Sequence, residues 1–165
     1  MRVLVVYGSK RGGTAGLSAL MGEALAARGI DVDVRPAKEV RAPEPYDAVI
    51  VAGALYATRW HRDARRFVRR NADALRRMPV WLVSSGPLDD TARAGQLPAV
   101  PQVAKLMTRV GARGHMTFGG RLTPDPTGFV AKAMAKKLTG DWRDPEQVRE
   151  FADAVVRDLA ATKNA

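Results

Sequence analysis

Short runs that are almost continuously apolar alternate along this chain with stretches of helical periodicity. The runs are residues 2–7 (RVLVVY), 47–52 (DAVIVA) and 80–83 (VWLV), and weaker strand patterns occupy 31–35 and 113–118. A strand without a polar face must be covered on both sides, as in a parallel sheet with helices above and below it. The pattern therefore predicts an α/β fold with a doubly wound, five-stranded parallel sheet in the order 2-1-3-4-5.

Five helices are expected between and after these strands. Their apolar residues recur three and four positions apart, and Asp144 followed by Pro145 is typical of a helix start. The expected ranges are 15–28, 60–77, 100–110, 128–138 and 145–161. Residues 89–99 have no clear period and are expected to form a loop. A single domain is expected over residues 1–161, with a frayed tail at 162–165.

The loop after the first strand carries the most specific motif. Residues 8–14 (GSKRGGT) stand between a buried strand and a helix start, where loop amides, hydroxyls and the positive end of the helix dipole converge on an anion. A magnesium–nucleotide loop of the Walker type would need lysine where Thr14 stands, and Lys10 breaks the Gly-x-Gly-x-x-Gly dinucleotide pattern. The spacing Ser9-x-x-Gly12-x-Thr14 suits a terminal phosphate dianion held without magnesium.

Two further loops are expected beside this one, because the carboxyl ends of parallel strands share one edge of the sheet. Residues 53–61 begin with small residues after a strand expected to end at Gly53, and they contain two aromatics. Residues 84–88 are again small and polar. A phosphate loop with two such neighbours predicts a pocket for flavin mononucleotide (FMN). Tyr56 and Trp60 could cover the flavin ring or could simply pack at the rim of the sheet.

Five stretches together resemble flavodoxin-fold proteins, and in particular the branch that contains menaquinone-dependent protoporphyrinogen oxidases. The Tyr-Asp-x-Val-Ile motif that opens the second stretch and the Gly-Asp-Trp-Arg-Asp motif that opens the last favour this branch. The stretches are Val3–Thr14, Tyr46–His61, Phe67–Pro79, Phe118–Leu122 and Gly140–Val148. The resemblance implies tightly bound FMN and oxidation of protoporphyrinogen at a membrane surface, with menaquinone as the electron acceptor.

The resemblance also implies the residues that hold the cofactor, and it assigns no catalytic residue. The implied phosphate positions are Ser9, Lys10, Arg11, Gly12, Gly13 and Thr14. The implied ring positions are Ala54, Leu55, Tyr56, Ala57, Ser85 and Gly86. The chain departs from the oxidase pattern at residues 88–102, and Arg11 replaces a small hydroxyl residue.

These observations favour an FMN-dependent oxidoreductase that passes electrons to a quinone, and protoporphyrinogen is the electron donor that the resemblance implies. The alternative is a flavodoxin-type electron-transfer protein with no substrate of its own. Flavodoxin electron carriers surround the flavin with acidic residues, whereas the expected rim here carries Lys10, Arg11, Arg59 and Arg62. Positive charge favours an anionic reduced flavin, which suits a quinone partner.

Composition sets the remaining limits. The chain has 27 Lys and Arg against 17 Asp and Glu, a formal net charge of +10, with no cysteine and two histidines. A disulfide and a thiolate or histidine-rich metal site are therefore excluded, and we expect no metal. No apolar run reaches a membrane span and no signal peptide is recognised, so a cytoplasmic protein is expected, with peripheral contact at the inner face of the membrane as an open alternative. The arginines of 60–77 surround the helix, so nucleic acid is not an expected partner and coding bias is a competing explanation.

Overall fold

The computed structural model describes residues 1–10, 12–86, 91–94, 97–122, 140–141 and 143–165. Its central sheet runs in the order β2-β1-β3-β5-β6, and all neighbouring strands on this path are parallel. The strands are β1 (Arg2–Gly8), β2 (Asp31–Pro36), β3 (Ala48–Tyr56), β5 (Val80–Ser85) and β6 (Gly114–Phe118). Counting the parallel strands alone, this is the predicted order 2-1-3-4-5, and the predicted fold class is confirmed.

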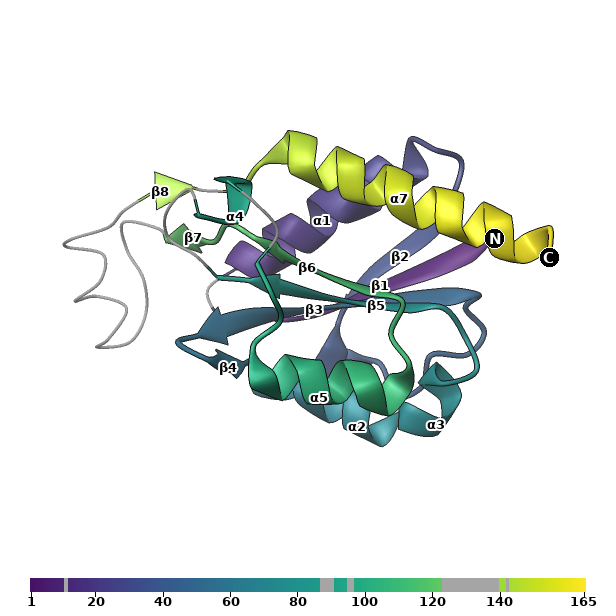
Figure 1. The fold of residues 1–165 in the computed structure, drawn as a ribbon, viewed down its shortest axis with the longest axis horizontal. Helices are drawn as coiled ribbons and strands as arrows, with labels where there is room; N and C mark the ends of the chain where they lie inside the picture. The colour runs from purple at the N-terminus through teal and green to yellow at the C-terminus, as the bar shows by residue number, and fades with distance from the viewer. Residues whose placement is uncertain (11, 87–90, 95–96, 123–139, 142) are drawn as a thin grey trace.

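Helices cover both faces of the sheet (Figure 1). The upper layer in this view is formed by α1 (Gly13–Ala26) and α7 (Pro145–Lys163). The lower layer consists of α2 (Arg62–Arg70), α3 (Ala72–Leu75) and α5 (Pro101–Val110). The remaining elements are short: η1 (Ala37–Glu39), β4 (Arg59–Trp60), α4 (Thr91–Ala94), β7 (Arg121–Leu122) and β8 (Gly140–Asp141).

The apolar strands divide their side chains between two cores. In β1, Val3 and Val5 pack towards α1 and α7, whereas Leu4 and Val6 pack towards α2, α3 and α5. All four side chains are fully buried. Burial of each such side chain contributes about 1.5–3 kcal/mol relative to exposure, so a polar residue on either face of β1 would be costly. This requirement on both faces explains why the strand reads as a continuous apolar run.

The single helix predicted over 60–77 was wrong. Trp60 belongs to β4, α2 begins at Arg62, and a break at Asn71 separates α2 from α3. The Asn71 side chain donates from Nδ2 to the carbonyl of Phe67 at 3.0 Å, so its amide bonds the backbone of α2 where that helix ends. Phe67 and Leu75 are both buried in the core below the sheet, so the apolar residues of this segment share one face in spite of the break.

Two other predicted boundaries change, those of the 89–99 loop and of the end of the last helix. The loop expected at 89–99 contains the short helix α4, and the helix expected at 128–138 lies outside the described residues. At the start of α7 the predicted cap is confirmed, because Asp144 Oδ1 accepts from the Glu146 N–H at 3.0 Å. The helix runs past Ala161 to Lys163, where the Thr162 hydroxyl bonds the Asp158 carbonyl at 3.0 Å.

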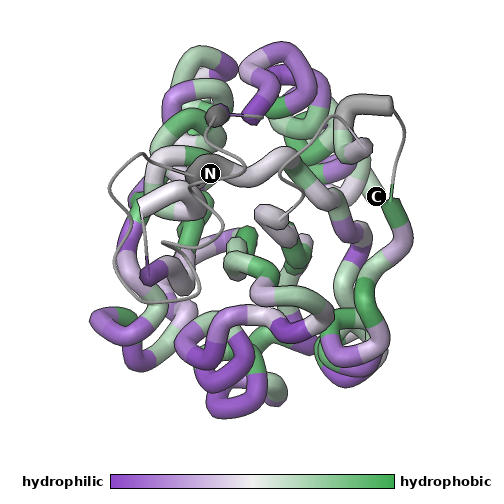
Figure 2. Tube along the Cα trace, turned by 90° about the vertical axis from the view of Figure 1, so that its left-hand side faces the viewer, coloured by the Kyte–Doolittle hydropathy of each residue, from purple (hydrophilic) through white to green (hydrophobic). Residues whose placement is uncertain are grey.

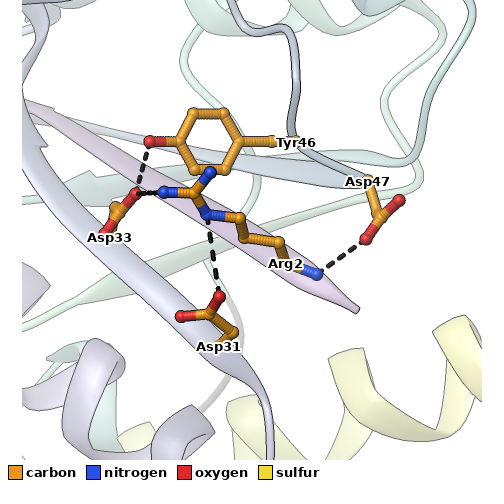
Figure 3. Close-up of polar contacts among 5 residues, drawn as sticks. All are labelled: Arg2, Asp31, Asp33, Tyr46 and Asp47. Atoms are coloured by element: carbon orange, nitrogen blue, oxygen red, sulfur yellow. Dashed lines mark hydrogen bonds and ion pairs between the residues drawn. The ribbon is translucent and has the colours of Figure 1, made fainter.

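The amino ends of the strands are fastened by a polar cluster around Arg2 (Figure 3). Arg2 Nη2 donates to Asp33 Oδ2 at 2.8 Å, and the guanidinium lies 4.9 Å from the centre of the Tyr46 ring. Tyr46 Oη donates to the same Asp33 oxygen at 2.5 Å, and the Arg2 N–H donates to Asp47 Oδ2 at 2.7 Å. This hydrogen bond from Tyr46, with the Arg2 charge, lowers the pKa of Asp33. The Tyr46–Asp47 pair therefore fastens the sheet at the edge opposite the predicted pocket.

Candidate functional site

The three predicted loops meet at the carboxyl edge of the sheet because their strands are parallel neighbours paired in register. Gly8 of β1 is the register partner of Gly53 in β3, and Gly53 is the partner of Ser84 in β5. Ala54 and Ser85 form the next pair. Figure 2 looks onto this edge of the molecule. The structure thus brings together the described members of all three groups of predicted site residues, while Arg11 lies outside the described residues.

The first loop turns the chain directly from β1 into α1. Gly12 adopts a left-handed conformation, with φ of 78°, that only glycine adopts without strain. Its N–H donates to Ser9 Oγ at 3.1 Å, and its carbonyl accepts from the Gly16 N–H at 2.9 Å. The helix begins at Gly13, two residues before the predicted start at Ala15. The loop is therefore folded by its own hydrogen bonds and closes onto the first turn of α1.

The start of α1 is arranged for an anion. No side chain caps the helix, and its first turn carries no acidic residue. The first-turn amides of a helix have no intrahelical acceptor, so they are donors for whatever lies at this end. Thr14 stands in that turn and is 2% exposed, whereas Lys10 is exposed on the loop. The first-turn amides of α1, the Thr14 hydroxyl and the Lys10 ammonium group are therefore hydrogen-bond donors within one short segment of the chain.

The second loop is a tight hairpin and not the long loop predicted over 53–61. Strand β3 continues past the predicted end at Gly53 to Tyr56, and β4 pairs back on it with Leu55 opposite Trp60. Ala57 in the turn has a positive φ of 56°, an uncommon conformation for a residue with a side chain. The hairpin leaves Tyr56 36% exposed at the rim. Cross-strand pairing of apolar residues lengthens the strand beyond the point where glycine predicted its end.

Trp60 packs under the hairpin and does not lie open to a ligand. Its side chain is 1% exposed, and Nε1 donates to the Val83 carbonyl at 3.3 Å. Its backbone N–H donates to Gln102 Oε1 at 2.8 Å. A Cβ at residue 53 would lie 2.7 Å from Trp60 Cδ1 and nearer still to Nε1, so glycine is required for this approach. Of the two predicted roles for Trp60, packing at the rim is the one observed.

The third loop rests against the second. The Gly86 N–H donates to the Phe118 carbonyl at 3.1 Å, which ties the loop to β6. A Cβ on Gly86 would stand 3.0 Å from Leu55, so the Leu55 side chain lies directly over this backbone. Ser85 is 6% exposed. The predicted ring positions on either side therefore form one contiguous patch around Leu55 and Gly86.

His61, the last residue of the predicted second loop, also contacts the first loop at Gly8, which was not predicted from the sequence. It caps α2, with Nδ1 accepting from the Asp63 N–H at 3.1 Å, and a Cβ on Gly8 would lie 2.6 Å from that atom. Its ring centre is 6.2 Å from that of Tyr56. Burial lowers the pKa of His61, and the nearby Lys10 charge adds to this, while Asp63 opposes it. The neutral form of His61, with Nδ1 as a hydrogen-bond acceptor, is therefore favoured at this position.

Arg143 packs against the helix that follows the first loop, a contact that was not predicted from the sequence. Its guanidinium occupies the space beside Gly16 in α1, and its side chain is only 11% exposed. Nε and Nη2 bind the two carboxylate oxygens of Asp141 at 2.9 and 2.6 Å, which raises the pKa of Arg143. The Gly-Asp-Trp-Arg-Asp motif was the available signal. Arg143 of this motif packs against α1, so the motif has a structural role whether or not it identifies a branch of the family.

The rim of the edge is cationic in the described part of the chain. Lys10, Arg59 and Arg62 are exposed there, and Asp63 is the acidic side chain near His61. His115 lies on β6 with Nε2 3.0 Å from Ser84 Oγ, and burial lowers its pKa. The predicted contrast with an acidic flavin rim therefore holds for the described residues.

Comparisons with known proteins agree with this arrangement. A family model described as a flavodoxin domain (Flavodoxin_5) matches residues 4–152. Among solved structures, a flavodoxin from Streptococcus pneumonia TIGR4 superposes with a TM-score of 0.63 at 19% identity, covering 96% of this chain and 99% of that one. Oxidised flavodoxin 2 from Bacillus cereus gives 0.58 at 18% identity, with 96% and 99% covered.

A third similar structure is that of a longer protein. Rubredoxin oxygen:oxidoreductase from Desulfovibrio gigas superposes with a TM-score of 0.67 at 14% identity. The match covers 99% of this chain but 37% of that one, so it is limited to part of the larger protein. Identities this low establish a shared fold. No curated protein matches the sequence.

Proposed function

The chain belongs to the flavodoxin domain family, and from this membership we propose that it binds FMN at the carboxyl edge of its sheet and serves as an electron-transfer protein without a substrate of its own. One observation carries the proposal: the neighbouring strands β1, β3 and β5 align Gly8, Gly53 and Ser84 in register at the carboxyl edge of the sheet. This register brings the start of α1, which has no side-chain cap, close to the loops that follow β3 and β5. The flavin, when bound, supplies the redox chemistry, and the protein supplies binding and electrostatics.

The residues present fit the phosphate of FMN. The loop from Ser9 to Thr14 is shaped by Gly12, it has no carboxylate among its residues, and the first-turn amides of α1 have no side-chain cap. A phosphate dianion at this place would receive hydrogen bonds from those amides and from the Thr14 hydroxyl, assisted by Lys10. Arg143, packed against Gly16, holds the helix that presents these donors.

The ring positions also fit a flat heterocycle. Ala54, Leu55, Tyr56 and Ala57 present the backbone of the hairpin and one aromatic face, while Ser85 and Gly86 present a second loop within contact of Leu55. Backbone amides and carbonyls can serve the polar edge of the flavin, and Tyr56 can stack on its face. His61 between the two loops holds Tyr56 near the strand end at Gly8.

Cofactor binding is tested first with the protein and FMN alone. Flavin fluorescence should be quenched on titration, and Thr14→Ala should weaken binding by about 5- to 150-fold, the equivalent of about 1–3 kcal/mol for a buried hydroxyl donor to a charged group. Thr91→Ala, exposed and outside all three loops, is the control and should leave the affinity unchanged. Undiminished binding by Thr14→Ala would remove this residue from the phosphate site.

Carrier activity is tested by anaerobic reduction of the FMN-loaded protein, followed by mixing with ferricyanide as a one-electron acceptor. Oxidation in proportion to the flavin present, with no turnover of added organic substrates, is the expected result. Sustained consumption of a substrate and a quinone together would contradict the carrier function.

The second candidate is the quinone-linked oxidoreductase, with protoporphyrinogen as the electron donor. It is favoured by the cationic rim of Lys10, Arg59 and Arg62, because positive charge stabilises the anionic reduced flavin and raises its potential. Within the described residues, no helix is long and apolar enough to cross a bilayer, so contact with a membrane quinone would be peripheral. Catalytic turnover of protoporphyrinogen with a menaquinone analogue, enhanced by anionic vesicles and weakened by salt, would establish this candidate over the carrier.

A further inference from the structure

Among the helices that the structure describes, positive charge is concentrated on one face of the sheet. The lower helical layer of Figure 1, taken as residues 62–77 together with α5, carries nine Lys and Arg against two Asp. On the opposite face, α1 and α7 together carry five Asp and Glu against three Lys and Arg. A coding bias towards arginine would act on both faces alike. The segregation therefore needs another explanation.

Most of these cations have no acidic partner. Arg76 pairs with Asp73 and donates from Nη1 to the Arg109 carbonyl, and Arg70 donates to the Val40 carbonyl. In the part of the chain that the structure describes, the remaining side chains of this layer form no ion pair. They are Arg62, Arg65, Arg66, Arg69, Arg77, Lys105 and Arg109. Unneutralised charge at this density repels itself, so an external anion would stabilise it.

A groove between α2 and α5 gathers three of these cations. It has a volume of about 620 Å³ and is lined by Arg69 of α2 and by Lys105 and Arg109 of α5, with polar Gln102 and Thr108 beside them and Leu106 at its buried floor. The three cations are exposed around a concave surface. Arginine presents a planar fork that binds a carboxylate through two parallel hydrogen bonds.

We propose that the groove between α2 and α5 is a docking site for an acidic segment of a partner protein, with clustered Asp or Glu side chains entering between Arg69, Lys105 and Arg109. Charge complementarity identifies the occupant, and the concave shape favours a protein segment over a flat lipid surface. Insertion into a bilayer or stacking on bases would call for apolar or aromatic side chains on this face. Among the described residues, the exposed large apolar side chains are Met1 and Tyr56, and neither belongs to this layer.

The groove is also connected to the candidate cofactor site. Gln102 at its lining accepts the backbone N–H of Trp60 at 2.8 Å, and Trp60 forms the return strand of the hairpin that carries the predicted ring residues. A partner held in the groove would therefore lie beside the second loop. The docking itself does not require the proposed cofactor, so it can be tested on the protein with and without FMN.

The test uses a fluorescein-labelled 16-residue peptide of alternating Glu and Gly, with fluorescence anisotropy as the readout. The groove variant is Arg69→Glu with Arg109→Glu, and the matched control is Arg149→Glu with Arg157→Glu on α7, which changes the net charge equally. All four arginines are exposed, and Arg149 already pairs with Glu146. If the groove variant does not fold, Arg69→Gln with Lys105→Gln replaces it.

We expect the groove variant to weaken peptide binding at least tenfold and the α7 variant to weaken it less than threefold, with affinity falling as salt rises. Equal losses in the two variants would show attraction by net charge alone and would overturn the proposal. So would the absence of peptide binding, or a groove-dependent affinity for anionic vesicles or duplex DNA that clearly exceeds the affinity for the peptide.

Discussion

Replacing Gly53 by alanine should destabilise the protein by about 2–3 kcal/mol, the upper part of the usual range for overpacking a core. The new methyl group would stand within 2.7 Å of Trp60 Cδ1. Gly53 has register partners on both sides, in β1 and in β5, so its backbone cannot move aside. Trp60 in turn is fixed by its bonds to Val83 and Gln102. The clash therefore cannot be relieved by a small movement of either residue.

A double-mutant cycle tests whether Trp60 is the source of this clash. Its second substitution is Trp60→Phe. It removes the Nε1 bond to the Val83 carbonyl, worth about 1 kcal/mol net, and part of the buried ring, worth about 1–2 kcal/mol. In the double variant the alanine methyl group would enter space that the indole has left. The double variant should therefore be more stable than the sum of the single losses by about 1–2 kcal/mol.

Urea unfolding followed by circular dichroism, with the slope m compared between variants, measures each corner of the cycle. The control is Gly29→Ala combined with Trp60→Phe. Gly29 also carries a cost, because its φ is 79°, but nothing lies within 4 Å of its added methyl group. This pair should be additive. If Gly53→Ala and Trp60→Phe also add within about 0.5 kcal/mol, the close approach of Trp60 to β3 is not what requires glycine there.

Three other predictions concern single residues. Ala57→Gly should raise the free energy of unfolding by about 0.5–1 kcal/mol in the same urea assay, since φ is 56° at this residue, whereas Thr58→Gly next to it should lower it. Burial lowers the pKa of His61 in the folded state, so its contribution to stability should be complete above about pH 6.5 and should decline as pH falls below that value. His61→Gln should therefore remove a slope of at most about 1.4 kcal/mol per pH unit from the free energy of unfolding in this range. An unchanged slope would contradict the assignment. Tyr46→Phe should raise the pKa of Asp33, as measured by NMR of the carboxyl group, and should lower the free energy of unfolding by about 1 kcal/mol at pH values above that pKa. An unchanged pKa would show that the hydrogen bond has no such effect.

The strand order could be predicted because it depends on burial, which the sequence records directly. A strand such as β1, with Val3 and Val5 facing one core and Leu4 and Val6 the other, must lie inside the sheet. The carboxyl-edge loops follow from that order, and glycine at Gly12 marked the turn into α1. These signals are local in sequence or periodic, and they need no knowledge of distant contacts.

The remaining features depend on contacts between segments that are far apart in sequence. The hairpin at Ala57 exists because Trp60 pairs with Leu55 and fills the space over Gly53, which a strand-ending glycine does not reveal. Arg143 reaches Gly16 across more than a hundred residues. The role of His61 required knowing that Gly8 lies against it. Motifs can mark such residues, but their function is decided by what the fold sets beside them.

The most direct test of the central claim is the ratio of the affinities for FMN and for riboflavin, which differ by the phosphate alone. Several charge-assisted hydrogen bonds at Ser9, Thr14 and the start of α1 should make FMN bind at least about a hundredfold more tightly, and Thr14→Ala should reduce that ratio by weakening FMN while leaving riboflavin unchanged. Equal affinities for the two flavins, or no quenching by either, would contradict a phosphate site at this loop.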